Sequence, residues 1–212
     1  GFTIIPSRSD SEEVTQVAPD IAVCPECLRD RKIQPHRLRY PFINCTHCGP
    51  RFSIIRDLPY DRQQTTMSAF AMCPDCRKEY TTVSDRRFHA QPVACNHCGP
   101  FYYAIYNNVK TEDYNELLDL SVRLLSEGEV IAAKGIGGYH LICDALNDRA
   151  VTRLRMIKQR DGKPFAVMFR DMEQLKQYVE VNPVEEDCLL SWRRPIVLLK
   201  QKRRLAADIN PD

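Results

Sequence analysis

The feature that most constrains this chain is a set of eight cysteines arranged as four C-x-x-C pairs. Two thiolates at positions i and i+3 can bind one metal ion from a single turn, and a second pair completes a tetrahedral shell. The first two pairs are separated by 17 residues and the last two by 18. This spacing is typical of tandem four-cysteine zinc fingers. The predicted ligands are Cys24, Cys27, Cys45, Cys48, Cys73, Cys76, Cys95 and Cys98.

The two halves of this cysteine set are copies of one another. CPEC at 24–27 returns as CPDC at 73–76, and CTHCGP at 45–50 returns as CNHCGP at 95–100. The repeat favours sequential pairing, with one zinc in each copy, over a crossed arrangement like that of DnaJ-type chaperones. Gly49 and Gly99 follow the last cysteine of each copy, where a positive φ would turn backbone N–H groups toward the sulfurs.

Disulfides and iron–sulfur ligation are the alternative roles for these cysteines. Disulfides need an oxidising compartment, and residues 1–20 show no basic segment followed by an apolar one. We therefore expect reduced thiols in a cytoplasmic protein. Four sulfurs leave no open position for water, so we expect the zinc to be structural. His47 and His97, inside C-x-x-C pairs, are expected at the surface or in hydrogen bonds behind the ligands.

The composition excludes several classes of protein. Hydrophobic residues make up 43% and charged residues 27% of the 212, which is ordinary for a folded chain. A net charge of +2 argues against a general nucleic-acid binder, and the short basic run at 200–204 is interpreted as solvated surface. The longest apolar runs fall far short of the roughly 20 residues that a membrane span needs.

We expect a linear series of segments along the chain. An extended linker occupies 1–20, the first finger 21–56, a polar linker 57–70 and the second finger 71–106. Beyond this, alternating helical and strand patterns predict an α/β domain over 110–212. Helices are predicted over 115–127, 147–160, 171–179 and 184–192, and strands over 130–133, 139–143, 164–169 and 195–199. Cys143 and Cys188 lie in apolar stretches and are expected in the core.

Two features of the α/β domain are candidates for ligand binding. Residues 134–138 form a glycine loop at a strand end that matches neither a Walker A loop nor G-x-G-x-x-G. Lys158, Arg160 and Lys163 cluster between a helix and a strand, where they suit a phosphate-bearing ligand. A solvated basic helix end explains the same cluster equally well, so residue chemistry alone leaves both interpretations open.

Together these motifs resemble a known family. The fingers, with YPFINCTHCGPRFSII at 40–55 and DRRFHAQPVACNHCGP at 85–100, look like those of the HypF hydrogenase maturation carbamoyltransferases. The stretch 117–169, with KGIGGYHLICDALN and IKQRDGKPFAVM, resembles a YrdC-type domain. The implied fold class is α/β, with tandem four-cysteine zinc fingers followed by an incomplete YrdC-like domain. The resemblance also implies that the chain is the middle of a longer enzyme and is inactive alone.

The resemblance implies a specific chemistry for that longer enzyme. It would convert carbamoyl phosphate and Mg-bound ATP to carbamoyl adenylate and pass the carbamoyl group to the C-terminal cysteine of HypE, for the cyanide ligand of nickel–iron hydrogenase. Its partners are HypE, carbamoyl phosphate and ATP, and its cofactors are two structural zinc ions. No catalytic residue is assigned. By this resemblance, the residues that contact substrate and ATP are Lys134, Gly135, Gly137, Gly138, Tyr139, His140, Lys158, Arg160 and Lys163.

Two other functions remain open. The first is an O-carbamoyltransferase of secondary metabolism, whose family shares the YrdC-like part. The second is a zinc-finger interaction module without catalysis, and the α/β half with its basic cluster weighs against that hypothesis.

Overall fold

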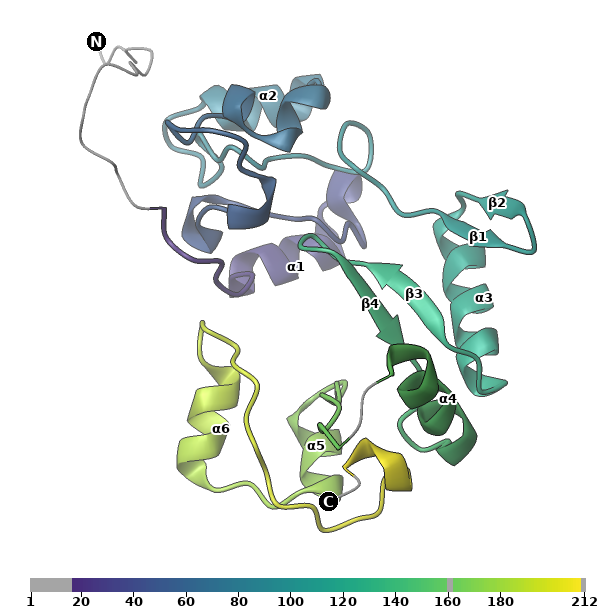
Figure 1. The fold of residues 1–212 in the computed structure, drawn as a ribbon. Helices are drawn as coiled ribbons and strands as arrows, with labels where there is room; N and C mark the ends of the chain where they lie inside the picture. The colour runs from purple at the N-terminus through teal and green to yellow at the C-terminus, as the bar shows by residue number, and fades with distance from the viewer. Residues whose placement is uncertain (1–16, 160–161, 211–212) are drawn as a thin grey trace. The chain divides into compact units, whose positions relative to one another are not determined.

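The computed structural model describes residues 17–159 and 162–210, so most of the predicted N-terminal linker lies outside the described residues. The chain divides into two compact units, Gly1–Phe101 and Tyr102–Asp212. The first unit contains both cysteine repeats, and the second contains the α/β part (Figure 1). In the described ranges, no helix has both the length and the apolar composition needed to cross a bilayer.

Short helices and loops make up the first unit. Two α-helices, α1 (Pro25–Ile33) and α2 (Pro74–Thr81), begin at the same place in each repeat. Both begin there because a cysteine N-cap is followed by proline, whose fixed φ suits the first helical position. The connections contain the 3-10 helices η1 (Pro35–Arg37), η2 (Thr46–Cys48), η3 (Phe52–Ile54), η4 (Arg62–Gln64) and η5 (Thr66–Ala69).

The polar segment at 57–70 packs into the first unit. Met67 is buried in the same apolar cluster as Tyr40 and the cysteines of the first repeat. The buried Arg62 guanidinium donates to the carbonyls of Gln91 at 2.7 Å and Val93 at 2.8 Å, both in the second repeat. A polar sequence can be buried here because its arginine satisfies carbonyls that burial would otherwise leave unpaired.

The second unit opens with a hairpin that the sequence patterns did not predict. Strands β1 (Ala104–Tyr106) and β2 (Val109–Thr111) pair antiparallel. Asn107 and Asn108 join them with φ of 49° and 62°. Two successive positive φ values define the type I′ turn, and asparagine tolerates them better than most residues. The strands are three residues each, too short for a periodic pattern to be visible.

The four predicted helices are confirmed as α3 (Tyr114–Ser126), α4 (Asp148–Lys158), α5 (Met172–Tyr178) and α6 (Pro183–Leu190). Gly128 ends α3 as expected, with φ +82° and its N–H bonded to the Leu125 carbonyl at 3.0 Å. Asn147 caps α4 by accepting from the Ala150 N–H at 3.1 Å. The unit also contains a short 3-10 helix, η6 (Ala207–Ile209).

Of the four predicted strands, two form and two do not. Strands β3 (Ile131–Lys134) and β4 (Tyr139–Ile142) make an antiparallel hairpin in which Ile131 is opposite Ile142. The predictions for 164–169 and 195–199 are wrong, because no described strand lies beside either segment to supply a ladder of hydrogen bonds. The isolated bridge between Val179 and Gln201 lies just beyond the second segment.

The core of the second unit is small. Its buried apolar residues include the cluster of Val151, Ala206 and Ile209, against which half-buried Cys143 packs. The prediction that Cys188 is a core residue is wrong, because its side chain is exposed on α6. A short helix with apolar residues on more than one side cannot bury all of them against one neighbour.

Candidate metal centres and phosphate-binding residues

The structure brings the eight predicted ligands into two clusters of four. Within each cluster the sulfur atoms all lie within 4.8 Å of one another. The grouping is sequential, as the repeat predicts, and not crossed. The clusters are Cys24, Cys27, Cys45 and Cys48 in the first repeat, and Cys73, Cys76, Cys95 and Cys98 in the second.

The sulfur geometry fits zinc. A tetrahedral ion with Zn–S bonds of about 2.3 Å requires sulfurs about 3.8 Å apart. In the first cluster the Sγ atom of Cys45 lies 3.6 Å from that of Cys24 and 3.8 Å from that of Cys48. In the second cluster Cys95 Sγ lies 3.7 Å from Cys73 Sγ and 3.8 Å from Cys98 Sγ. Four mostly buried sulfurs at this spacing form a closed shell, which suits a structural ion.

The protons on several of these thiols must leave when a metal binds. Burial raises the pKa of Cys24 to about 12 and that of Cys95 to about 11. The pKa of Cys45 is instead lowered, because its sulfur accepts hydrogen bonds from neighbouring thiols. The thiols whose pKa is raised hold their protons until a metal replaces them. Metal uptake at these sites should release protons.

The two glycines after the fingers have different roles. Gly49 has φ +66° and ψ −174°, which confirms the expected positive φ. Gly99 is not in that region, and the expectation for it is wrong. A Cβ at Gly99 would lie 2.0 Å from the Tyr40 hydroxyl oxygen, so glycine is required there for space. Neither glycine N–H bonds a sulfur: they bond the carbonyls of Thr46 and Cys95.

Two arginines that the sequence reasoning missed donate to cysteine sulfurs. Arg37 Nη2 lies 3.2 Å from Cys76 Sγ, and Arg86 Nη1 lies 3.1 Å from Cys27 Sγ. A guanidinium beside a thiolate stabilises its negative charge. An arginine in each spacer was a visible signal, but nothing local showed that each arginine reaches the other repeat.

The spacer and finger histidines are not part of the sulfur shells. His47 and His97 are exposed. His36 lies with its Nε2 atom 3.5 Å from a Glu79 carboxylate oxygen. The pKa of His36 is lowered, mainly by burial and then by the charge of Arg37. His89 stacks on Tyr80 with ring centroids 4.7 Å apart.

The predicted substrate loop joins β3 to β4. The Gly135 N–H donates to the Gly138 carbonyl at 2.7 Å, which closes the loop. Gly138 has φ +152°, and a Cβ there would meet no atom within 4 Å. Lys134 Nζ lies 5.7 Å from the ring centroid of Tyr139, across the ends of the strands. The loop therefore exposes Lys134, Tyr139 and His140 to solvent.

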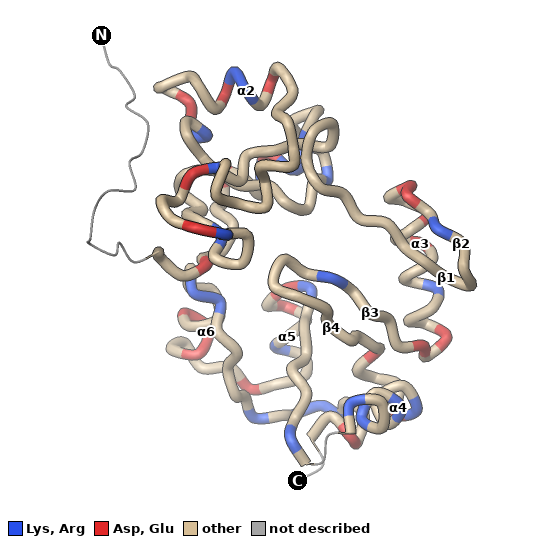
Figure 2. Tube along the Cα trace, turned by 45° about the horizontal axis from the view of Figure 1, so that its top comes forward, with Lys and Arg blue, Asp and Glu red and all other residues tan. Residues whose placement is uncertain are grey.

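The predicted cations lie at the end of α4. Lys158 is the last residue of that helix, and Lys163 is exposed in the extended segment that follows. Arg160 lies outside the described residues. Figure 2 shows basic positions along α4, and Figures 1 and 2 show the β3–β4 loop at the end of the hairpin away from α4. In the described ranges, no hydrogen bond or ion pair joins that loop to Lys158 or Lys163.

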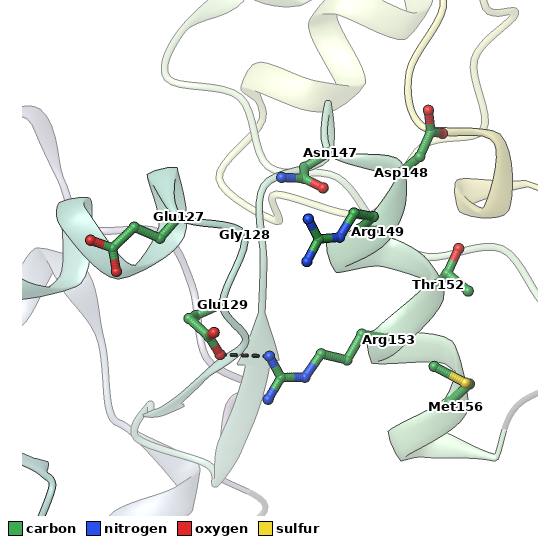
Figure 3. A pocket seen from close by; sticks show the side chains of 9 residues that line it. All are labelled: Glu127, Gly128, Glu129, Asn147, Asp148, Arg149, Thr152, Arg153 and Met156. Carbon is green, nitrogen blue, oxygen red and sulfur yellow. Dashed lines mark hydrogen bonds and ion pairs between the residues drawn. The ribbon is translucent and has the colours of Figure 1, made fainter.

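A hollow of about 460 Å³ lies elsewhere in this unit, between the end of α3 and the start of α4 (Figure 3). Arg153 bonds Glu129 across it at 2.6 Å, so these two opposite charges are paired. None of the predicted substrate residues lines it. Its lining residues are Glu127, Gly128, Glu129, Asn147, Asp148, Arg149, Thr152, Arg153 and Met156.

Two family models match the chain. The HypF finger model matches residues 23–55 and 72–105, which contain all eight clustered cysteines. The Sua5/YciO/YrdC model, described as telomere recombination, matches residues 123–212. The chain carries the zinc-finger and YrdC-like regions of the HypF family. The HypF-type fingers thus coincide with the first unit, and the YrdC-like region lies within the second.

Curated relatives agree over the whole chain. It is 46% identical over 211 residues to the carbamoyltransferase HypF of Rhodobacter capsulatus, covering 100% of this chain and 28% of that protein. It is 42% identical over 204 residues to the probable carbamoyltransferase HypF of Methanocaldococcus jannaschii, covering 95% of this chain and 26% of that protein. The chain therefore spans little more than a quarter of the length of these carbamoyltransferases.

Solved HypF structures share the fold. One is a crystal structure of full-length HypF in the phosphate- and nucleotide-bound form, with 53% identity and a TM-score of 0.82. It matches over 92% of this chain and 26% of its own. A second, HypF of T. kodakarensis, has 44% identity and a TM-score of 0.84, and matches over 98% of this chain and 28% of its own.

Proposed function

We propose that these residues belong to a carbamoyltransferase that forms carbamoyl adenylate from carbamoyl phosphate and ATP. The carbamoyl group then passes to the C-terminal cysteine of HypE, for cyanide ligand synthesis in nickel–iron hydrogenase maturation. The observation that carries the proposal is the pair of four-sulfur clusters within two HypF finger matches, joined to a YrdC-like region. Relatives with this arrangement are carbamoyltransferases, and one was crystallised with phosphate and nucleotide.

The zinc ions hold the finger unit together and take no part in the transfer. Four sulfurs fill each shell, so each ion supplies rigidity and offers no open coordination position. The all-thiolate shells require a reducing compartment, which supports our proposal of a cytoplasmic enzyme.

We propose that the second unit contacts the nucleotide. Lys158 and Lys163 have exposed side chains, and no ion pair engages either of them among the described residues. With Arg160 they would neutralise the phosphates of Mg-bound ATP. Hydrolysis of carbamoyl phosphate releases phosphate and carbamate, and the carbamate oxygen attacks the α-phosphorus as pyrophosphate leaves. The loop of Gly135, Gly137 and Gly138, with Lys134, Tyr139 and His140, would receive the carbamate and keep water away from the adenylate.

Carbamoyl-phosphate-dependent exchange between ATP and pyrophosphate tests this proposal in the longest natural protein that contains these residues. Lys158→Ala should reduce the exchange rate about tenfold to a hundredfold, because one charge is lost at the developing negative charge of the transition state. Lys202→Ala is the matched control, since Lys202 is an exposed lysine outside the proposed cluster.

Two results would count against the proposal in different ways. If Lys158→Ala exchanges as fast as the control, the phosphate role of that lysine is wrong. If the unaltered protein shows no exchange but still binds HypE, the non-catalytic interaction module is the better interpretation.

A further inference from the structure

The two zinc fingers exchange backbone hydrogen bonds. Thr46 and Asn96 each follow the first cysteine of the C-T-H-C or C-N-H-C pair. The Thr46 N–H donates to the Arg86 carbonyl at 3.1 Å, and the Asn96 N–H donates to the His36 carbonyl at 3.0 Å. Each metal-binding turn is therefore bonded to the spacer of the other repeat. The arrangement is reciprocal, because 46 and 96 are 50 positions apart, as are 36 and 86.

Side chains of each repeat likewise donate hydrogen bonds to cysteine sulfurs of the other repeat. Arg37, in the first repeat, donates to Cys76 Sγ of the second, and Arg86, in the second repeat, donates to Cys27 Sγ of the first. Both sulfurs belong to the second cysteine of the CPEC or CPDC pair. Neither arginine is a metal ligand. Arg37 of the first repeat lies against the second site, and Arg86 of the second repeat lies against the first site.

Carboxylates fix these arginines in place. Asp30 on α1 and Glu79 on α2 each lie three positions after the contacted cysteine. Glu79 binds Arg37 at 2.5 Å, and Asp30 binds Arg87 at 2.6 Å as well as Arg86. The helix that begins at each finger's first pair therefore holds the arginines of the opposite spacer.

Through these contacts, folding of the chain around one metal site helps to fold the chain around the other. Zinc at the first site fixes Cys27 and the start of α1, which places Asp30 to hold Arg86. Zinc at the second site fixes Cys76 and α2, which places Glu79 to hold Arg37. Arg37 is fully buried, and a buried guanidinium is costly unless its charged partners are in position.

We propose that the two four-cysteine sites load zinc cooperatively, and that Arg37 and Arg86 are the positioning residues that couple them. Filling one site raises the zinc affinity of the other, because it holds the arginine of the opposite spacer and so orders the segment that joins the other site's two cysteine pairs. Residues that support metal ligands typically change metal affinity 10- to 100-fold, which sets the size of the expected coupling.

Native mass spectrometry of the full chain, given half of the zinc needed to fill both sites, measures the coupling. Independent sites of equal affinity leave about half of the chains with one zinc, and unequal affinities leave more. A tenfold coupling lowers that share to about a quarter, because the population shifts to empty and doubly loaded chains. A share clearly below half supports the proposal, and a share of half or more overturns it.

Variants identify the residues responsible. Arg37→Met and Arg86→Met keep side-chain length without the charge, and we expect the singly loaded share to rise toward half in each. Arg77→Met is the matched control, because Arg77 adjoins Cys76 in sequence and is exposed on α2. General destabilisation would weaken uptake at both sites without raising that share. The double variant, in which both sites lose the same contact, separates lost coupling from unequal affinities. An unchanged share in both variants would refute the role of the arginines, and the measurement on the unaltered chain needs no variant to fold.

Discussion

Replacing Gly99 by alanine tests whether space or backbone conformation requires glycine after the second finger. The added Cβ would lie 2.0 Å from the Tyr40 hydroxyl oxygen and 2.6 Å from Ala94 Cβ. Tyr40 is only 1% exposed and packs in the cluster that contains the first-site cysteines, so its ring has little room to move. Overpacking of this kind costs about 1–3 kcal/mol, and the short contact places Gly99→Ala at the upper end of that range.

Gly49→Ala is the matched control, because it meets strain without a clash. Its Cβ would lie 3.7 Å from Ile21, which is ordinary contact, but the residue has φ +66°. Its ψ of −174° places it in a region that essentially only glycine adopts, and a non-glycine residue there costs about 1–3 kcal/mol. We therefore expect both substitutions to lower the free energy of unfolding by about 1–3 kcal/mol, Gly99→Ala through the clash and Gly49→Ala through backbone strain.

Urea unfolding of the zinc-saturated protein, followed by circular dichroism, measures both costs. Tyr40→Phe supplies a second background, since the Tyr40 hydroxyl is buried with no hydrogen-bond partner in the described part of the chain. Removing an unsatisfied hydroxyl should cost little, and it removes the 2.0 Å contact. Gly99→Ala should then be less destabilising than in the unaltered protein. Equal costs of Gly99→Ala in the two backgrounds would refute the steric argument, and the cost of Gly49→Ala should be the same in both backgrounds.

Two further predictions follow from the fingers and from the exposed thiols. With zinc bound, Cys188 should react first with a thiol reagent, and half-buried Cys143 should react more slowly. The other eight of the ten cysteines should react only after a chelator is added. Fast labelling of more than two thiols would contradict the closed shells. Burial raises the pKa of Glu79, but the hydrogen bond and charge of Arg37 outweigh burial and hold that pKa below its ordinary value of 4.5. The unfolded chain therefore binds a proton at Glu79 more readily than the folded chain does. The ionised Glu79 carboxylate thus stabilises the fold above pH 4.5, and this stabilisation is lost as the pH falls through the lowered pKa. Unfolding free energies at about pH 6 and about pH 4 should differ less in Glu79→Gln than in the unaltered protein, and an equal difference would contradict the assignment.

Much of the metal-binding region could be predicted because its information is local. A C-x-x-C pair places two sulfurs on one turn, so the eight ligands and their sequential grouping follow from spacing and repetition. The helices of the second unit were similarly predictable, since caps such as Asn147 and stops such as Gly128 act over a few residues. The segments at 164–169 and 195–199 have a strand-like pattern, but a strand forms only when another segment lies beside it.

The sequence by itself determined where the ligands lie, how they divide between two sites, and which family the motifs resemble. Only the tertiary structure decided that Arg37 and Arg86 reach the sulfurs of opposite fingers, across 39 and 59 positions of chain. It alone also decided that Gly99 is required for space beside Tyr40. The physical reason is that ligand spacing is set by bond geometry within a turn. The partner of a buried charge, or the room for a Cβ, is instead set by how two distant segments pack.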